Sequence, residues 1–263
     1  DNIVLTGHDN GHLFAWDHSD YGRFISMTNM EAPIQSITVI SNATIVCALA
    51  SGDVVTCSAD PNDIFNNKVT VFTQPGCVDV MDSIKSDSLP SIIYCTGRTE
   101  FYLVEPMTWK RLVCFSGHTE QVTAIQTSRD WVISGDSEGN CRLWNLDGSC
   151  HRIFSQPHSS AVKCVALSSD GRFAMTGSLD TTVHVWPLKG DDLDAVTVLK
   201  CFRTSVDFVG FASPTRLWAY TESELMFVWD YPASKFNALI PHVLIPRQCS
   251  GAPHILPRWY GAR

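Results

Sequence analysis

The sequence predicts an all-β protein in which one small antiparallel sheet is repeated around an axis. Aromatic residues that end strand-like runs recur across the chain at intervals of 86, 42, 42 and 43 residues, the first being two such periods. They are Trp16, Tyr102, Trp144, Trp186 and Trp229. Each period contains four short strands and almost no helical periodicity. The fixed period separates this architecture from a β-sandwich, which strand propensity alone does not.

The units follow one another in chain order. The first begins at its second strand, residues 3–7, so its innermost strand is missing. The second and third units, around residues 47–60 and 93–106, are the most divergent. The fourth and fifth are the clearest, and Ser, Asp and Gly turn formers separate their strands. We expect their strands at 121–128, 131–135, 140–146 and 150–155, then at 161–168, 173–177, 182–188 and 196–202.

Composition excludes several classes of protein. Hydrophobic residues make up 44% of the 263 residues and charged residues 17%, which is typical of a globular chain. The formal net charge of −8 disfavours nucleic acid as the main ligand, because phosphate binding needs clustered Lys and Arg. No uninterrupted apolar run of 18 residues exists, so we expect no membrane insertion.

The ten cysteines indicate free thiols rather than a disulfide framework. No C-x-x-C pair occurs, so neither a zinc site nor a redox motif is indicated. Several cysteines lie inside strand-like apolar runs, where a thiol acts as a small hydrophobe. These are Cys47, Cys95, Cys114, Cys141 and Cys164. We therefore expect an intracellular protein in a reducing compartment, the cytoplasm or the nucleus.

Three features give the repeat a family resemblance. Gly117-His118 opens a unit, acidic residues occupy the third turn of a unit, and Trp16-Asp17 and Trp229-Asp230 close third strands. In these features residues 3 to about 240 resemble WD40 repeats, although the second and third units lack the Trp-Asp pair. The resemblance implies a β-propeller of four-stranded antiparallel blades, with about six blades visible.

The resemblance also implies a hydrogen-bonded tetrad within a blade. In WD40 proteins a His, a Ser or Thr, a turn acid and the third-strand Trp are joined in this way. The matching residues are His158, Thr176, Asp180 and Trp186 in the fifth unit, and His118, Ser134, Glu138 and Trp144 in the fourth. In the sixth unit, Ala219 and Ser223 stand at the equivalent places, so we expect no network there.

The number of blades and the C-terminal tail leave alternatives open. We divide the chain into a propeller at 1–240, with an incomplete first blade, and a Pro- and Arg-containing tail at 241–263. Residues 242–246 could supply the first blade's inner strand and close a six-bladed ring. Alternatively, the chain is part of a propeller of seven or more blades, which its start at Asp1 favours. The tail could also strap the domain or bind a partner.

Two motifs suggest catalysis or metal binding. Gly135–Gly139 satisfies G-x-S-x-G, but a nucleophile elbow needs a strand-to-helix turn and this segment is followed by another strand. His8 and His12 flank a turn rather than share a helix face. We therefore expect no catalytic residue, metal, cofactor or small-molecule substrate.

The resemblance implies a non-catalytic interaction scaffold, and we expect a structural subunit of a larger multiprotein assembly whose partners are other proteins. The family's usual binding side corresponds to Asp9, Glu120, Ser137, Ser160, Leu179 and Glu222. Three of these six are acidic, so we expect a basic or extended partner segment. In the tail, Arg247, Arg258, Trp259 and Tyr260 are further candidates, because Arg and aromatic residues often anchor interfaces. A reader of a peptide or RNA segment and a propeller enzyme are the alternatives.

Overall fold

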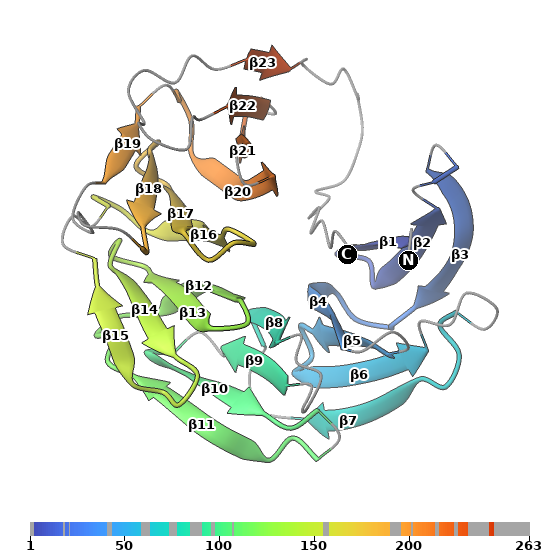
Figure 1. The fold of residues 1–263 in the computed structure, drawn as a ribbon. Helices are drawn as coiled ribbons and strands as arrows, with labels where there is room; N and C mark the ends of the chain where they lie inside the picture. Colours follow the sequence, from blue (N-terminus) through green and yellow to red (C-terminus); the bar gives the residue numbers. More distant parts are fainter. Residues whose placement is uncertain are drawn as a thin grey trace. The chain divides into compact units, whose positions relative to one another are not determined.

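In the part of the chain that the structure describes, the computed structural model is all-β, as predicted, with 23 strands in six antiparallel sheets (Figure 1). Five sheets have four strands and the first has three. The structure describes residues 3–17, 19–20, 22–40, 44–58, 64–73, 78–84, 91–95, 98–106, 108–154, 158–189, 196–200, 202–213, 216–223, 226–230 and 242–244.

The chain forms two compact units, and the division passes through the third sheet. The first unit contains the first two sheets and β8–β9, and the second contains the fourth to sixth sheets. The strands of the first three sheets are β1 (Ile3–Gly7), β2 (His12–Asp17) and β3 (Arg23–Asn29); β4 (Ile34–Ile40), β5 (Thr44–Leu49), β6 (Asp53–Ser58) and β7 (Val69–Thr73); and β8 (Val80–Ile84), β9 (Ser91–Cys95), β10 (Glu100–Val104) and β11 (Arg111–Ser116).

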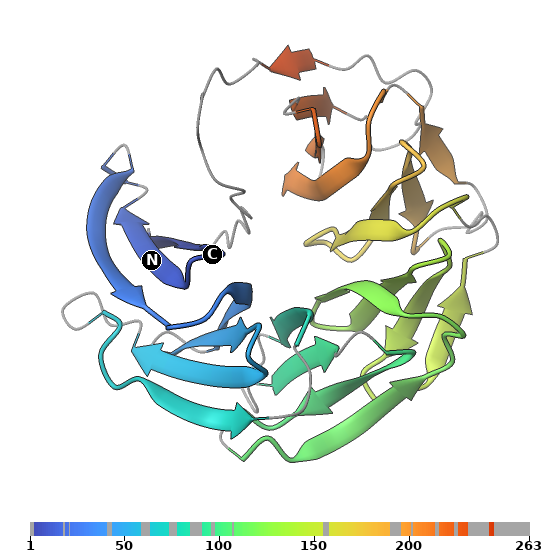
Figure 2. The same cartoon turned by 180° about the vertical axis from the view of Figure 1, so that it is seen from behind.

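The fourth, fifth and sixth sheets each follow the order of the chain from first to fourth strand. In the two opposite views of Figures 1 and 2, the first strands of neighbouring sheets lie side by side, β12 against β16 and β16 against β20. The strands are β12 (Val122–Thr127), β13 (Trp131–Asp136), β14 (Cys141–Asn145) and β15 (Cys150–Ile153); β16 (Val162–Leu167), β17 (Phe173–Ser178), β18 (Val183–Pro187) and β19 (Thr197–Leu199); and β20 (Val206–Ser213), β21 (Arg216–Thr221), β22 (Met226–Asp230) and β23 (His242–Leu244).

Alternation along each strand gives every sheet two faces, and the core lies between neighbouring sheets. Ile133 and Leu143 of the fourth sheet pack with Val162 and Trp186 of the fifth sheet in one buried cluster. The approach is close at Gly135, where an added Cβ would lie 2.4 Å from Cγ1 of Val162. These contacts stack the blades within the second unit.

The segment proposed to complete the first sheet lies elsewhere. β23 pairs antiparallel with β22, with Val243 opposite Phe227, and is the fourth strand of the sixth sheet. The interpretation of residues 242–246 as the first blade's inner strand is therefore wrong. The sixth sheet takes this segment because β23 follows β22 closely in the chain, and strands that are consecutive in sequence usually pair. The first sheet keeps three strands among the described residues, as its late start in the sequence indicates.

The divergent third sheet is completed by an aromatic residue from a turn. Trp109 lies between β10 and β11 in a left-handed backbone conformation, with φ of 52°. Its buried ring stacks on Phe72 at 5.3 Å and meets the edge of Tyr94 at 5.8 Å. The third-strand aromatic residue, Tyr102, is half-buried and donates its hydroxyl to Glu100. The turn thus supplies the bulk that a buried third-strand Trp supplies in later sheets.

Candidate interaction site and its supporting network

The fifth sheet contains a continuous hydrogen-bonded chain of four side chains. Nε1 of Trp186 donates to Oγ1 of Thr176 at 3.1 Å, and that hydroxyl lies 2.8 Å from Nε2 of His158. Nδ1 of His158 lies 3.0 Å from Oδ2 of Asp180. The buried indole, hydroxyl and imidazole leave few alternatives for pairing, because an unsatisfied buried group costs about 1–3 kcal/mol. This is the order of contacts that the WD40 resemblance implied.

Asp180 also fixes the loop geometry at one end of the sheet. Its carboxylate accepts the backbone N–H of Ser159 at 2.9 Å and the backbone N–H of Thr182 at 2.9 Å. Burial raises the pKa of Asp180, but hydrogen bonds from Thr182 and Ser159 and the charge of His158 outweigh it and hold that pKa below its usual value. The ionised side chain therefore ties the β17–β18 turn to the leading loop, which we define as the segment before a blade's first strand.

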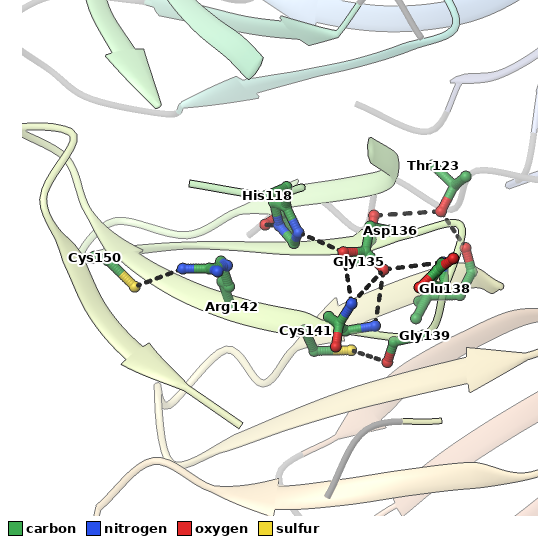
Figure 3. A network of polar contacts seen from close by, with 12 residues as sticks. His118, Thr123, Gly135, Asp136, Glu138, Gly139, Cys141, Arg142 and Cys150 are labelled. Carbon is green, nitrogen blue, oxygen red and sulfur yellow. Dashed lines mark hydrogen bonds and ion pairs between the residues drawn. The ribbon is translucent and has the colours of Figure 1, made fainter. Parts of the chain in front are cut away.

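The fourth sheet has the same network with a different acid. Nε1 of Trp144 donates to Oγ of Ser134 at 2.8 Å, and that oxygen lies 2.6 Å from Nε2 of His118. Nδ1 of His118 lies 2.9 Å from Oδ2 of Asp136. Figure 3 draws this contact as a dashed line. Glu138, the acid expected from the sequence, is exposed and contributes its backbone N–H to Asp136 at 3.1 Å. The assignment of Glu138 to the tetrad is therefore wrong.

The register of the second strand explains why Asp136, and not Glu138, binds His118. Asp136 ends β13 opposite Val122, and Ser178 ends β17 opposite Val162, so the two residues are equivalent. Asp136 is fully buried, and besides His118 it accepts the backbone N–H and the amide of Asn140 at 2.8 and 3.1 Å. An acid at the strand end thus reaches the imidazole and the turn at once, and Glu138 is left at the surface.

Both network histidines are buried, and each ring contacts a carboxylate. Burial lowers the pKa of His118, and the hydrogen bond and charge of Asp136 raise it only in part. Burial likewise lowers the pKa of His158, with Asp180 opposing the shift. A neutral imidazole with its proton on Nδ1 donates to the acid and accepts the Ser or Thr hydroxyl. This state is consistent with a structural role for both rings.

Partial networks occur in other sheets. In the first sheet, Nε1 of Trp16 donates to Oγ1 of Thr6 at 3.0 Å, a pair that sequence reasoning missed. The signal was present, because ten residues separate this pair, as they separate Thr176 from Trp186. In the sixth sheet, Ala219 is buried at the matching position and carries no acceptor for an indole.

A shared backbone hydrogen bond positions three of the expected partner-binding residues. The residue after the second strand donates its N–H to the leading loop of its own blade in three successive sheets. Ser137 donates to the Gln121 carbonyl at 2.8 Å, Leu179 to Ala161 at 3.0 Å, and Glu222 to Ser205 at 3.1 Å. We call Ser137, Leu179 and Glu222 the turn row. Their side chains therefore project from equivalent backbone positions.

The surroundings of the turn row are acidic with one apolar residue. Leu179 is 46% exposed, and Glu222 is exposed while it accepts the Ser205 hydroxyl at 3.0 Å. Glu138 adds a second exposed carboxylate beside Ser137, which is half-buried. The leading-loop candidates Glu120 and Ser160 are half-buried in the same unit, and Asp9 is exposed in the first unit. The tail candidates Arg247, Arg258, Trp259 and Tyr260 lie outside the described residues.

The motifs weighed for other chemistry have plain structural settings. Ser137 of the G-x-S-x-G segment lies in a turn between strands β13 and β14. Across the described ranges, no three His, Cys, Asp or Glu side chains are grouped so that they could hold a metal ion. The same residues include no helix with the length and apolarity needed to cross a membrane.

Of the five cysteines expected in the interior, Cys47, Cys141 and Cys164 are buried and Cys114 is exposed, while the side chain of Cys95 lies outside the described residues. Cys47, Cys57, Cys141 and Cys164 are buried free thiols. Burial raises the pKa of Cys57 to about 11 and that of Cys141 further, so these thiols stay protonated. Cys114, expected in the interior, is exposed, because it lies on the outermost strand β11.

Comparison with known proteins identifies the repeat in the fourth and fifth sheets as a known type. A family model described as "WD domain, G-beta repeat" matches residues 109–145 and 148–187. The computationally designed Ika8 protein, known from a crystal structure, superposes with a TM-score of 0.66 at 21% identity, over 88% of this chain and 68% of that one. At this identity the structural likeness shows the fold alone.

Curated relatives match over short segments. Cell division control protein 4 of Candida albicans is 30% identical over 89 residues, which are 33% of this chain and 13% of the relative. Small ribosomal subunit protein RACK1z of Arabidopsis thaliana is 37% identical over 79 residues, 27% of this chain and 24% of the relative. The tRNA (34-2'-O)-methyltransferase regulator WDR6 of Pongo abelii is 22% identical over 133 residues, 48% of this chain and 12% of the relative.

The chain thus spans less than a quarter of the length of each of these relatives. Each of the two matched segments contains one complete tetrad, and the six described sheets follow the same antiparallel plan. The WD40 repeats matched at 109–145 and 148–187, together with the curated relatives and the antiparallel sheets, support a WD40-repeat β-propeller.

Proposed function

We propose that this protein is a non-catalytic scaffold that holds other proteins, as a structural subunit of a larger intracellular assembly. The turn row is the observation that carries the proposal. An exposed Leu179 stands between equivalent positions on neighbouring blades, and one backbone hydrogen bond to the leading loop fixes each of the three positions. A fixed, partly apolar row suits a partner segment laid across several blades. The name of the matched RACK1z describes a component of a larger particle, the ribosomal subunit.

The charge around the turn row indicates the kind of partner. Glu138 and Glu222 are exposed in their turns, and Glu120 is half-buried in the leading loop of the fourth sheet. A basic or extended protein segment would be complementary to these carboxylates. An RNA segment would face repulsion from them, so a peptide is the better form of the reader alternative. The free buried thiols support a reducing compartment for this assembly.

A matched pair of charge reversals tests the proposal. Glu138→Lys and Asp130→Lys make the same charge change at exposed turn residues of the fourth sheet, one in the β13–β14 turn and one in the β12–β13 turn at the opposite end. Proteins that copurify with the complete polypeptide in moderate salt are quantified for each variant. We expect the first variant to lose a stoichiometric partner and the second to keep it. Equal retention by both variants, or a wild-type protein that purifies alone, would contradict the proposal.

A further inference from the structure

The turn between β1 and β2 contains the one Asn-Gly pair of the sequence, Asn10-Gly11. Two backbone hydrogen bonds close this turn, from the His8 N–H to the His12 carbonyl at 3.0 Å and from the Gly11 N–H to the His8 carbonyl at 3.0 Å. Asn10 is exposed and Gly11 is buried. The pair therefore lies in an ordered hairpin turn, with the Asn side chain at the surface.

Turns of the same build join β13 to β14 and β17 to β18. Each holds five residues between the last paired positions of its strands, namely 8–12, 136–140 and 178–182. The third residue of the turn is Asn10 in the first sheet, Glu138 in the fourth and Asp180 in the fifth. At these three equivalent positions, Asn10 is the residue without a carboxylate.

Asn10 makes the same contact within its turn as the acid of the fifth sheet. Oδ1 of Asn10 accepts the backbone N–H of His12 at 3.1 Å, and Oδ1 of Asp180 accepts the backbone N–H of Thr182 at 2.9 Å. An amide oxygen and a carboxylate oxygen are both acceptors for such a donor. A carboxylate in place of the Asn10 amide would therefore keep this hydrogen bond.

The turn requires glycine directly after Asn10. Gly11 has φ of +82°, and a Cβ added to it would lie 2.9 Å from the Ala32 carbonyl oxygen and 2.9 Å from Oδ1 of Asn29. The Gly11 carbonyl also accepts the backbone N–H of Met30 at 2.8 Å. A side chain at this position would clash with fixed neighbours. Because glycine has no Cβ, its backbone nitrogen is also the least hindered one for attack on the preceding side chain.

We propose that Asn10 is a site of spontaneous deamidation, whose aspartate product gives the first sheet the carboxylate that the fifth sheet has in Asp180. The Gly11 nitrogen loses its proton to water and forms a bond to Cγ of Asn10. The bond from Cγ to the side-chain nitrogen breaks, and that nitrogen takes a proton from water and leaves as ammonia. Water then opens the resulting cyclic imide at either carbonyl, which produces aspartate or isoaspartate without any oxidation or reduction.

The closed turn limits the rate of this reaction. The Gly11 nitrogen must lose its proton before it attacks, and in the turn its N–H is buried and donates to the His8 carbonyl. Local opening of the turn therefore precedes the attack. We expect deamidation at Asn10 to become faster as the pH rises and faster still when the chain is unfolded in urea. The product adds a negative charge beside Asp9, which is exposed, and the inference does not rest on the proposed function.

Peptide mapping of the complete protein tests this proposal. The folded protein is incubated at mildly alkaline pH and digested in water labelled with heavy oxygen, so that carboxylates formed during digestion are recognised. Mass spectrometry with electron-based fragmentation then separates aspartate from isoaspartate. We expect both products at Asn10. Conversion that gave aspartate without isoaspartate would overturn the cyclic-imide route.

Asn29 is the matched internal control. It is exposed, and its Oδ1 accepts the backbone N–H of Glu31 at 2.8 Å, which is the contact that Asn10 makes with His12. Asn29 is followed by Met30 instead of glycine. We expect several-fold more conversion at Asn10 than at Asn29 in the same sample. Equal conversion at the two residues would overturn the proposal.

Two variants separate the chemistry from its structural consequence. Asn10→Gln should keep its amide, because its imide ring would be larger and forms slowly; loss of that amide at the wild-type rate would show direct hydrolysis and overturn the proposal. Asn10→Asp reproduces the aspartate product and should unfold at the same temperature as the wild type. A clear fall in Tm would show that the turn does not accept a carboxylate, and would overturn the equivalence with Asp180.

Discussion

Replacing Asp136 with Ala removes the acceptor that joins His118 to the β13–β14 turn. The carboxylate is fully buried and accepts hydrogen bonds from four donor groups: Nδ1 of His118, the backbone N–H of Glu138, and the backbone N–H and side-chain amide of Asn140. The imidazole donor would be left unpaired in the interior, at about 1–3 kcal/mol. The turn donors can reach water and would cost about 1 kcal/mol each. With three such turn donors, we expect a total loss of about 4–6 kcal/mol.

The matched control is Glu138→Ala, two residues away in the same turn. Its exposed side chain is outside the network, so we expect its effect on the free energy of unfolding to stay within about 0.5 kcal/mol. Thermal unfolding followed by circular dichroism distinguishes the two variants. For a chain of this size we expect Asp136→Ala to lower Tm by roughly 10 °C and Glu138→Ala by about 1 °C.

A double-mutant cycle locates the loss. If the histidine–acid contact carries most of the cost, the variant His118→Ala with Asp136→Ala should be less destabilised than the sum of the two single variants. The reasoning would be refuted if Glu138→Ala were as destabilising as Asp136→Ala. It would also be refuted if Asp136→Ala left Tm unchanged, because the buried acid would then have no structural role.

Three further outcomes are expected. Burial lowers the folded-state pKa of His118 and His158, so the unfolded chain binds more protons than the folded chain below pH 6.5. The free energy of unfolding should therefore fall as the pH decreases from 6.5 toward 5. Urea titrations at several pH values measure it, and a rise in stability over this range would disprove the prediction. Gly139→Ala should lower the free energy of unfolding by about 2 kcal/mol or more, because φ is +96° and the added Cβ would lie 2.3 Å from the His158 carbonyl oxygen. An unchanged stability in the same urea assay would argue against this turn conformation. Lys163 of β16 pairs with Asp207 of β20, and Lys163 is substantially exposed. Replacing either residue with a neutral one should therefore cost about 1 kcal/mol or less, and exchanging the two residues should restore most of that stability. If the exchange restored nothing, the two charges would not pair.

The sequence was most informative where one local pattern decides the structure. The four-strand period predicted the sheets because strand alternation and turn residues act over short distances. The fifth-sheet contacts from His158 to Trp186 also followed the pattern, since a buried indole, hydroxyl and imidazole satisfy one another. The pair of Thr6 and Trp16 obeys the same ten-residue spacing and could have been found.

The structure differs from the sequence-based predictions where residue spacing along the chain allows more than one arrangement. Two acids, Asp136 and Glu138, lie in one turn, and only the strand register shows that the first points at the imidazole. The burial of Trp109 depends on a left-handed turn and a ring on another sheet. The segment that forms β23 could pair with β22 or complete the first sheet, and spacing does not choose between them.

The most direct test of the account is hydrogen exchange of the complete protein with and without its copurified partner. The central claim is that partners dock on the loops that the tetrads hold rigid, next to the turn row. We predict protection of backbone amides at residues 119–121, 137–139, 159–161 and 179–181 when the partner is bound. Protection confined to the opposite ends of the same sheets, at residues 128–130, 146–149 and 168–172, would contradict the claim.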